Sequence, residues 1–215
     1  MAVNKIQIEL LRKLLRHGAK ERVIKTLEKF RSADLAEFFG YLNPGEQKQL
    51  IEILYTHERA ADTLLELPQG ILEEILSILD EDRIASLINR LAPDDGAFFA
   101  SLLDDERVDA VLGKVDENRR IRIDHLRTYA AESAGSLMSA DMLTVREDMT
   151  VEQALQAIRE RAGESEFIFY VYVVNESKTF LGVVPIRRLI AAQPYATLSE
   201  IMVTNPVAVK ATDDQ

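Results

Sequence analysis

The chain has 215 residues, of which 47% are hydrophobic, so it can form one large or two ordinary domains with a sizeable core. It contains no cysteine, which excludes a disulfide framework and a thiolate metal site and fits a reducing cytosol. The formal net charge of −10 indicates that the protein as a whole repels phosphate, so we expect no nucleic-acid partner.

The start of the chain differs in charge from the segment that follows. Residues 1–31 contain nine Lys/Arg and three Asp/Glu, a net charge of +6, whereas residues 33–117 contain six Lys/Arg and twenty Asp/Glu, a net charge of −14. In the basic segment Ile6, Leu10 and Leu14 recur at helical spacing and predict an amphipathic helix with a basic outer face. Such a face could meet nucleic acid or lipid headgroups, but the favoured interpretation is a solvated surface beside an acidic neighbour.

The sequence predicts no membrane span. Its longest uninterrupted apolar run, residues 167–174, has eight residues, far fewer than the roughly 20 that a spanning helix needs. The first residues lack the long apolar core and the cleavage site of a signal peptide. We therefore expect no direct insertion of this chain into a membrane.

The acidic segment repeats itself. Leu42, Leu67, Leu91 and Val115 follow one another at intervals of 25, 24 and 24 residues. A period of this length is typical of stacked helical hairpins. The sequence therefore predicts an all-α helical-repeat superhelix with an acidic outer surface, whose hand stays open.

Prolines and acids mark the expected helix boundaries in this repeat. A proline fits the first helical turn, where its missing N–H has no partner, and three prolines stand at such places: Pro44, Pro68 and Pro93. Three aspartates precede other helices as N-caps: Asp80, Asp104 and Asp116. One apolar stripe that we expect to be buried between hairpins consists of Leu72, Ile75, Leu76 and Leu79.

The pattern changes at Met142. Residues 142–145 predict a short strand, and Thr150 with Gln153 predicts a capping box for a helix. That helix should turn its apolar residues inward, namely Val151, Leu155 and Ile158. Two strands, over residues 167–174 and 180–184, and a second helix that starts at Pro185 should follow. The expected order is strand, helix, strand, strand, helix.

The opening of this α/β unit then returns. Leu137 and Met138 match Ile201 and Met202, and Val145 matches Val209, each at an offset of 64 residues. The same offset places Gln215 opposite Val151, so we expect the second copy to be cut off as its first helix begins.

A duplicated unit of this kind resembles the cystathionine-β-synthase (CBS) regulatory module. An acidic helical repeat that leads into "AGSLM", followed by "TVEQALQAIR", "YVYVVNESKTFLGVVPIRRLI" and "IMVTNPVAV", resembles the cytosolic region of the MgtE family of magnesium transporters. The resemblance implies an N-terminal helical domain over residues 1–130, a first CBS unit over residues 131–195 and an incomplete second CBS unit over residues 196–215. The fold class is thus an all-α superhelix followed by an α/β domain.

The resemblance implies a Mg²⁺ sensor that gates a pore. The expected partners are the protein's own transmembrane domain and, when the CBS pair is complete, a second copy, at the cytoplasmic face of the cell membrane. In the incomplete pair, apolar surface around Ile186, Leu189 and Ile190 should be under-covered. The small side chains of residues 132–136 predict a flexible connector between the two domains.

The resemblance also suggests ligands for a regulatory Mg²⁺. Asp94 stands where the family places an acidic ligand, Asp95 follows it, Asp62 falls on another acidic position, and the backbone carbonyl near Ser136 matches one that faces the ion. The alternative, left open, is that Asp94 and Asp95 complement a helix dipole and Asp62 is a solvated acid. Phe98 departs from the pattern, because the family can place a second acid there.

Adenine nucleotide is the other ligand of CBS units, and we expect it to be unlikely here. The hydroxyl and carboxylate that such units often offer after Gly182 are replaced by Pro185 and Arg188. Tyr170 could still stack on a base and Arg187 could meet phosphate, although a strand aromatic is more often core. Two rival functions remain: an adenine-nucleotide sensor, and a scaffold whose helical stack binds a protein.

No catalytic set emerges from the sequence. His17, His57 and His125 are isolated and have no spacing for zinc, so we interpret them as surface or cap residues. The glycine in "AGES", Gly163, belongs to a turn rather than to a phosphate loop. We expect no enzyme.

Overall fold

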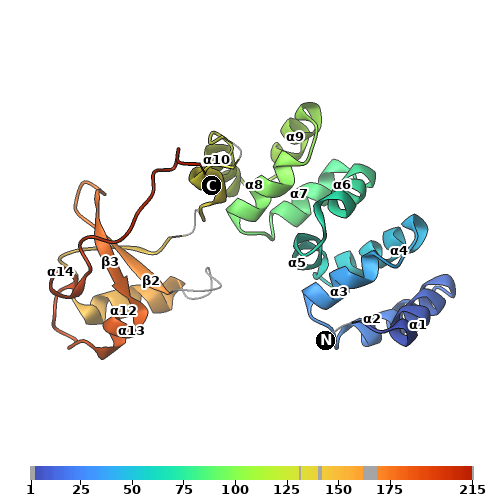
Figure 1. Cartoon of the computed structure of the whole chain (residues 1–215), viewed down its shortest axis with the longest axis horizontal. Coiled ribbons are helices and arrows are strands. Elements are labelled where there is room, and N and C mark those ends of the chain that lie inside the picture. Colours follow the sequence, from blue (N-terminus) through green and yellow to red (C-terminus); the bar gives the residue numbers. More distant parts are fainter. Residues whose placement is uncertain (1–2, 131, 140–141, 162–168, 215) are drawn as a thin grey trace. The chain divides into compact units, whose positions relative to one another are not determined.

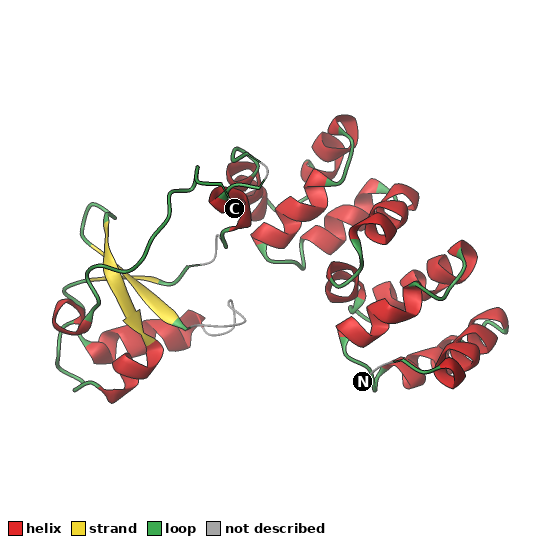
Figure 2. Cartoon of the chain, in the orientation of Figure 1, coloured by secondary structure: helices red, strands yellow, loops and turns green. Residues whose placement is uncertain are grey.

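The chain separates into two compact units. The structure is a computed structural model that describes residues 3–130, 132–139, 142–161 and 169–214. The first unit spans Met1–Thr128 and the second spans Tyr129–Gln215. In the described residues, strands are confined to the second unit (Figure 2). A helical region followed by a mixed α/β domain confirms the predicted fold class.

The first unit consists of short helices that follow one another from α1 at one end to α10 at the other (Figure 1). Their bounds are α1 Lys5–Arg16, α2 Lys20–Leu27, α3 Ser32–Phe39, α4 Pro44–Thr56, α5 Ala60–Leu65, α6 Gln69–Ile78, α7 Glu81–Ile88, α8 Pro93–Ser101, α9 Asp105–Leu112 and α10 Glu117–Leu126. One continuous apolar core runs through them and includes the whole predicted stripe from Leu72 to Leu79. Each helix therefore buries its apolar side against its neighbours.

Most of the predicted helix starts are observed. Pro44 and Pro93 are the first residues of α4 and α8, whereas Pro68 lies one residue earlier, at the N-cap of α6. Asp80 caps α7, since its Oδ1 accepts a hydrogen bond of 2.9 Å from the N–H of Arg83.

The predicted side-chain caps at Asp104 and Asp116 are wrong. Both residues occupy N-cap positions, but neither side chain accepts a capping hydrogen bond. A side-chain cap would accept hydrogen bonds from the N–H groups of Arg107 and Arg119. These groups donate instead to the backbone oxygens of Asp104 and Asp116, at 2.9 and 3.0 Å. The backbone itself thus closes these two first turns.

The rotation of α1 about its axis also differs from the prediction. Ile6 and Leu10, predicted to face inward, are 77% and 45% exposed, and the buried residues are Leu11 and Leu15. The cause is a contact with α4, 34 residues away along the chain: the Nε of Arg12 lies 3.1 Å from the buried carboxylate of Glu46. Because this contact must face α4, the side of α1 that carries Ile6 faces outward.

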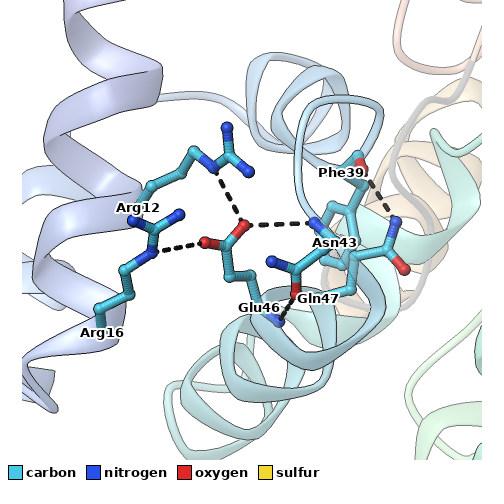
Figure 3. Close-up of polar contacts among 6 residues, drawn as sticks. All are labelled: Arg12, Arg16, Phe39, Asn43, Glu46 and Gln47. Carbon is cyan, nitrogen blue, oxygen red and sulfur yellow. Dashed lines mark hydrogen bonds and ion pairs between the residues drawn. The ribbon is translucent and has the colours of Figure 1, made fainter.

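Glu46 is fully paired within this contact (Figure 3). Its oxygens accept hydrogen bonds from Arg12 and Arg16, both at 3.1 Å, and from the N–H of Asn43 at 3.2 Å. Asn43 in turn caps α4 by accepting from the N–H of Glu46 at 3.0 Å. Burial alone would raise the pKa of Glu46, but the Asn43 N–H and the two guanidiniums outweigh it, so the pKa lies below its usual value.

The second unit is built around a three-stranded sheet. Its elements are α11 Ala134–Leu137, β1 Thr144–Arg146, α12 Val151–Arg161, β2 Tyr170–Val174, β3 Phe180–Pro185, α13 Ile186–Ala191 and α14 Leu198–Ile201. β1 pairs with β2 in parallel and β2 with β3 antiparallel, with the strand order β1-β2-β3. The predicted order of strands and helices is confirmed, although the first strand starts two residues later than expected. Residues 167–168 of the second predicted strand, and Gly163, lie outside the described residues.

The core of this unit agrees with the sequence pattern except at α13. The capping box holds, because the Thr150 N–H donates to Gln153 at 2.9 Å and the Gln153 N–H to Thr150 at 3.3 Å. Val151 is buried, with Leu155 and Ile158 packed beside it. Leu189, predicted to be under-covered, is fully buried, whereas Ile190 is 69% exposed. α13 therefore packs its inner side on the sheet without a second complete unit.

The chain after α13 folds back on β3 and α11. Val203 pairs with Val183 of β3, and the backbone N–H of Gly135 donates to the oxygen of Ala211 at 2.8 Å. α14 lies 64 residues after α11, at the offset of the sequence repeat. The prediction of a flexible connector over residues 132–136 is wrong for its last part, because Ser133 is buried and α11 is tied to this returning segment.

Candidate functional site

The first turn of α8 carries the two leading candidates. Ala92 is the N-cap residue, Pro93 is the first helical residue, and Asp94 and Asp95 follow. Asp94 is half-buried, and its Oδ1 is shielded from solvent without a hydrogen-bond partner among the described residues. An unpaired, buried carboxylate oxygen is costly unless a donor or a cation meets it. The chemistry of this oxygen therefore fits a cation ligand, and its place at a helix N-terminus also fits complementation of the dipole.

The helix that carries Asp94 packs closely against α10. α8 packs against α10, and a Cβ added to Gly96 would lie 2.9 Å from Cδ1 of Ile123. A side chain at position 96 would therefore require Ile123 to shift, so α8 and α10 pack closely beside the first turn that carries Asp94. Phe98, one helical turn beyond Asp94, is 41% exposed and contacts the Phe99 ring edge-on, so this surface offers a carboxylate beside an aromatic side chain.

Asp62 has a different environment. It lies exposed on α5, near Arg90, whose guanidinium forms an ion pair of 2.8 Å with Glu58. The hydrogen bond to Glu58 is the main cause of a raised pKa of Arg90, and Asp62 adds a weaker attraction. A metal ion at Asp62 would thus meet a neighbouring positive charge.

Ser136 belongs to the second unit. Its hydroxyl donates to the backbone oxygen of Ser133 at 2.8 Å, within the four-residue helix α11. The last carbonyls of a helix have no partner within it, so the Ser136 carbonyl is available as a ligand. In the described part of the chain, no three His, Asp or Glu side chains gather to hold a metal ion.

Tyr170 and Arg187 lie at the same end of the sheet. Tyr170 at the start of β2 is the register partner of Pro185 at the end of β3, and Arg187 follows in the first turn of α13. Both side chains are exposed, so Tyr170 is not the core residue that strand aromatics usually are. Gly182 lies inside β3, where a Cβ would stand 2.4 Å from the oxygen of Val203.

The second unit contains a polar cavity of about 420 Å³ that the sequence did not predict. It is lined by Arg146, Glu147, Asp148, Val174, Glu176, Thr197 and Ser199. Arg146 pairs with Asp148 at 2.6 Å and with Glu176 at 3.4 Å. The hydrogen bond between Arg146 and Asp148 raises the pKa of the arginine and lowers that of the aspartate. No sequence signal joins these residues, because β1, the β2–β3 turn and α14 bring them together.

The three histidines lie at helix ends. His17 and His57 follow α1 and α4 as C-cap residues, and His125 lies exposed in the last turn of α10. Within the described residues, every helix is too short or too polar to cross a membrane.

Residues 30–132 match the MgtE intracellular N domain, and residues 134–195 match the CBS domain. The magnesium transporter MgtE of Thermus thermophilus is 31% identical over 217 residues, a match that covers 95% of this chain and 46% of the relative. MgtE of Bacillus subtilis is 25% identical, with 94% of this chain and 45% of the relative covered. The chain thus spans a little under half the length of these curated relatives.

Two crystal structures are similar to the structure of this chain. The cytosolic domain of the Mg²⁺ channel MgtE in complex with ATP matches with a TM-score of 0.85 and 29% identity, over 95% of this chain and 83% of that structure. The soluble part of a magnesium transporter matches with a TM-score of 0.82 over 98% of this chain and 82% of that structure, and at 21% identity it supports the fold alone. We expected adenine nucleotide to be an unlikely ligand. The ATP complex of the MgtE channel does not support that expectation. The matched relatives are transporters, which confirms that the chain is not an enzyme.

Proposed function

Because the chain joins an MgtE intracellular N domain to a CBS domain and so belongs to the MgtE family, we propose that it is the cytosolic regulatory region of a magnesium transporter and senses free Mg²⁺. In this proposal the ion draws the two units together and biases the pore toward its closed state. The partners are the protein's own transmembrane domain and a second copy, at the cytoplasmic face of the membrane.

The observation that carries the proposal is the unpaired buried Oδ1 of Asp94. Mg²⁺ is a hard cation that prefers oxygen ligands and keeps several of its waters, so one or two carboxylates suffice for a weak site. Asp94 and the carbonyl near Ser136 are the proposed ligands, with Asp95 and Asp62 as further acids. Within either unit, the described residues bring no three His, Asp or Glu side chains together.

A weak site suits a sensor, but one ion is not enough. To shift the ratio of closed to open conformations from 1:99 to 99:1, the ligand must bind the closed conformation about 10⁴-fold more strongly. Several modest sites, each with its own differential affinity, can together supply such a factor. The acidic segment, residues 33–117 with a net charge of −14, offers carboxylates for several such sites. While the Mg²⁺ concentration is low, these carboxylates repel other acidic side chains.

Small-angle scattering tests the proposal directly. The radius of gyration should fall when MgCl₂ replaces KCl at matched ionic strength. Asp94→Asn should weaken this response with little loss of stability, whereas Asp95→Asn should do less, since adjacent helical side chains point about 100° apart. Identical profiles in both salts would refute Mg²⁺ sensing and favour the rival scaffold function. Equal responses of wild type and Asp94→Asn would remove Asp94 from the site.

Adenine-nucleotide binding is a second candidate, favoured by the ATP complex of a relative and by the position of Tyr170 and Arg187 at the same end of the sheet. An aromatic face and a guanidinium can hold a base and a phosphate. Calorimetric titration with ATP should then give a signal that Tyr170→Ala and Arg187→Gln weaken. The departures at Pro185 and Arg188 argue for weak affinity, and no heat of binding at millimolar ATP would exclude this function.

A further inference from the structure

The helices α1 and α2 carry positive charges that nothing in the described structure neutralises. Arg12 and Arg16 pair with Glu46. The other cations of this hairpin and the turn after it are exposed and form no ion pair with a described residue: Lys5, Lys13, Lys20, Arg22, Lys25 and Lys29. By contrast, arginines further along the unit pair with acids, such as Arg83 with Glu52 and Arg90 with Glu58. The acidic neighbour that the sequence suggested thus accounts for only two of the basic residues.

Apolar side chains lie among these charges on one face of α1. Ile6 is 77% and Leu10 45% exposed, one helical turn apart. At about 100° per residue, Lys13, Ile6, His17 and Leu10 fall within an arc of about 60°. We call this surface the α1 outer face and define it by Ile6, Leu10, Lys13 and His17. Lys5 is also exposed and lies on the flank of the helix, about 80° from Lys13. A helix with exposed branched aliphatic residues between lysines is typical of an interfacial helix.

The fold holds this face outward. Leu11 and Leu15 are buried in the core on the opposite side of α1, and Arg12 and Arg16 clamp the helix to Glu46 of α4 (Figure 3). α1 and α2 also form one end of the helical unit, while the acidic repeats continue toward α10 (Figure 1). Because charges are screened beyond about 8 Å at physiological salt, the local charge at this end matters more than the net charge of the chain.

We propose that the α1 outer face docks on an anionic lipid surface, with the lysines between membrane phosphates and Ile6 and Leu10 in the headgroup layer. The inference goes beyond the proposed function and takes from it only that a membrane lies nearby. Such a helix lies on the membrane and does not span it. Nucleic acid fits less well, since Ile6 and Leu10 would face phosphates and the α1 outer face has no Phe, Tyr or Trp for stacking on bases.

Co-sedimentation of the full chain with vesicles tests this docking. In EDTA, the chain should bind vesicles of phosphatidylglycerol and phosphatidylcholine, and neither bind phosphatidylcholine alone nor remain bound at high salt. The double variant Lys5→Gln/Lys13→Gln should lose about 25-fold in affinity, at about fivefold for each lysine. Ile6→Ser/Leu10→Ser should lose at least about tenfold, since both side chains leave an apolar environment. All four residues are exposed, so circular dichroism should stay unchanged.

Lys178→Gln/Lys210→Gln is the matched control, because it removes two exposed lysines of the second unit and should bind as wild type does. Equal binding to neutral vesicles, or wild-type affinity of the Lys5/Lys13 variant, would overturn the proposal. So would tighter binding to a DNA duplex than to the vesicles. Asp94→Asn should bind vesicles normally, so a failure of Mg²⁺ sensing and a failure of lipid docking give different results.

Discussion

Glu46 shows how one buried charge decides the orientation of a helix. It is only 4% exposed, yet Arg12, Arg16 and the Asn43 N–H satisfy its oxygens. Removing one member of a buried, fully paired group is costly, because the groups that remain lose their partner. The placement of α1, and with it the α1 outer face, therefore depends on this carboxylate.

We predict that Glu46→Gln lowers the free energy of unfolding at neutral pH by about 2 kcal/mol. The pKa of Glu46 is lowered in the folded state, so its contribution is complete above the unfolded value of about 4.3 and is lost as the pH falls through the folded pKa. The difference between wild type and variant should thus shrink below about pH 4. Urea denaturation of both proteins across this pH range measures it.

Glu58→Gln is the control for that experiment. The pKa of Glu58 is also lowered, by its hydrogen bond to Arg90, but its side chain is exposed. Solvent screens such a pair, so stability should change little at any pH. A pH dependence that is the same in both variants would mean that the buried pairing of Glu46 is not its cause.

Gly182 controls the approach of the returning chain to the sheet. A Cβ at this position would lie 2.4 Å from the oxygen of Val203, a backbone atom that cannot move aside alone. We predict that Gly182→Ala destabilises the second unit by about 1–3 kcal/mol. Hydrogen exchange should show faster opening around residues 198–203, with the helical unit unchanged.

Gly70→Ala is the matched change in an open place. Nothing lies within 4 Å of a Cβ at Gly70, which occupies the first turn of α6. Alanine should therefore stabilise the helical unit by about 0.5–1 kcal/mol. If Gly182→Ala were as harmless as Gly70→Ala, the pairing of Val183 with Val203 would not be held as closely as described.

At the level of elements, arginines join one helical hairpin to the next. Arg107 donates to the backbone oxygens of Leu76 at 3.1 Å and Leu79 at 2.7 Å, at the end of α6. Arg59 donates likewise to Leu27 at 3.0 Å and Phe30 at 2.6 Å, at the end of α2. Helix ends leave such carbonyls unpaired, and positive charge there is favourable. Each arginine thus caps a helix of the preceding hairpin.

Arg83 stands midway, 24 residues from each of these arginines. Instead of carbonyls it meets the carboxylate of Glu52 and lies over the ring of Tyr55, 5.8 Å from its centroid. These residues of α4 correspond to Leu76 and Leu79 of α6, since the sequence separations are the same. The middle hairpin therefore uses side chains where its neighbours use backbone.

We predict that Arg107→Gln lowers the stability of the helical unit by about 1–3 kcal/mol, because two carbonyls at a helix end lose a charged donor. Arg83→Gln should cost less, since its partner Glu52 is partly exposed and can turn to water. Chemical denaturation followed by helix content compares the two. Equal losses would show that the repeat arginines act through charge alone.

The sequence predicted these elements where their causes are local. The helices of the repeat follow from apolar spacing and from prolines and caps within each segment, as at Pro44, Pro93 and Asp80. The rotation of α1 could not be predicted, because it depends on Glu46, which lies 34 residues away from Arg12. The arginine repeat was present in the sequence, but its meaning depends on which carbonyls the stack brings within reach.

In the candidate site, too, the sequence predicts what depends on local residues and not what depends on tertiary packing. The resemblance supplied Asp94, but only packing leaves its Oδ1 buried and without a partner. Tyr170 lies on the outer face of β2, on the side opposite the buried Val171 and Val173, and the continuous apolar run of this strand does not reveal which face is buried. The cavity around Arg146 joins three separate segments and has no sequence signal at all.

At the scale of the whole molecule, the two units differ in how completely they cover their apolar surface. The helical unit has one continuous core. The second unit leaves apolar residues exposed along its last segment, where Val207 is fully exposed and Val209 is 70% exposed, and on α13 at Ile190. An exposed apolar patch can mark a place that another domain or chain covers. A second CBS unit, which the sequence repeat predicts to begin at residue 196, is the expected cover.

We predict that this 215-residue chain is largely monomeric at micromolar concentration. CBS pairs, by resemblance, associate through helices of both units, and a specific interface buries about 800 Å² on each partner. One sheet with α12 and α13 offers only part of that surface, and Leu189, the most buried residue of α13, already packs inward. Extending the chain by a complete second CBS unit should therefore shift sedimentation velocity profiles from monomer to dimer, with Ile190→Ser weakening the dimer. A tight dimer of the present chain would place the interface elsewhere, on surface that the first CBS unit or the helical unit already provides.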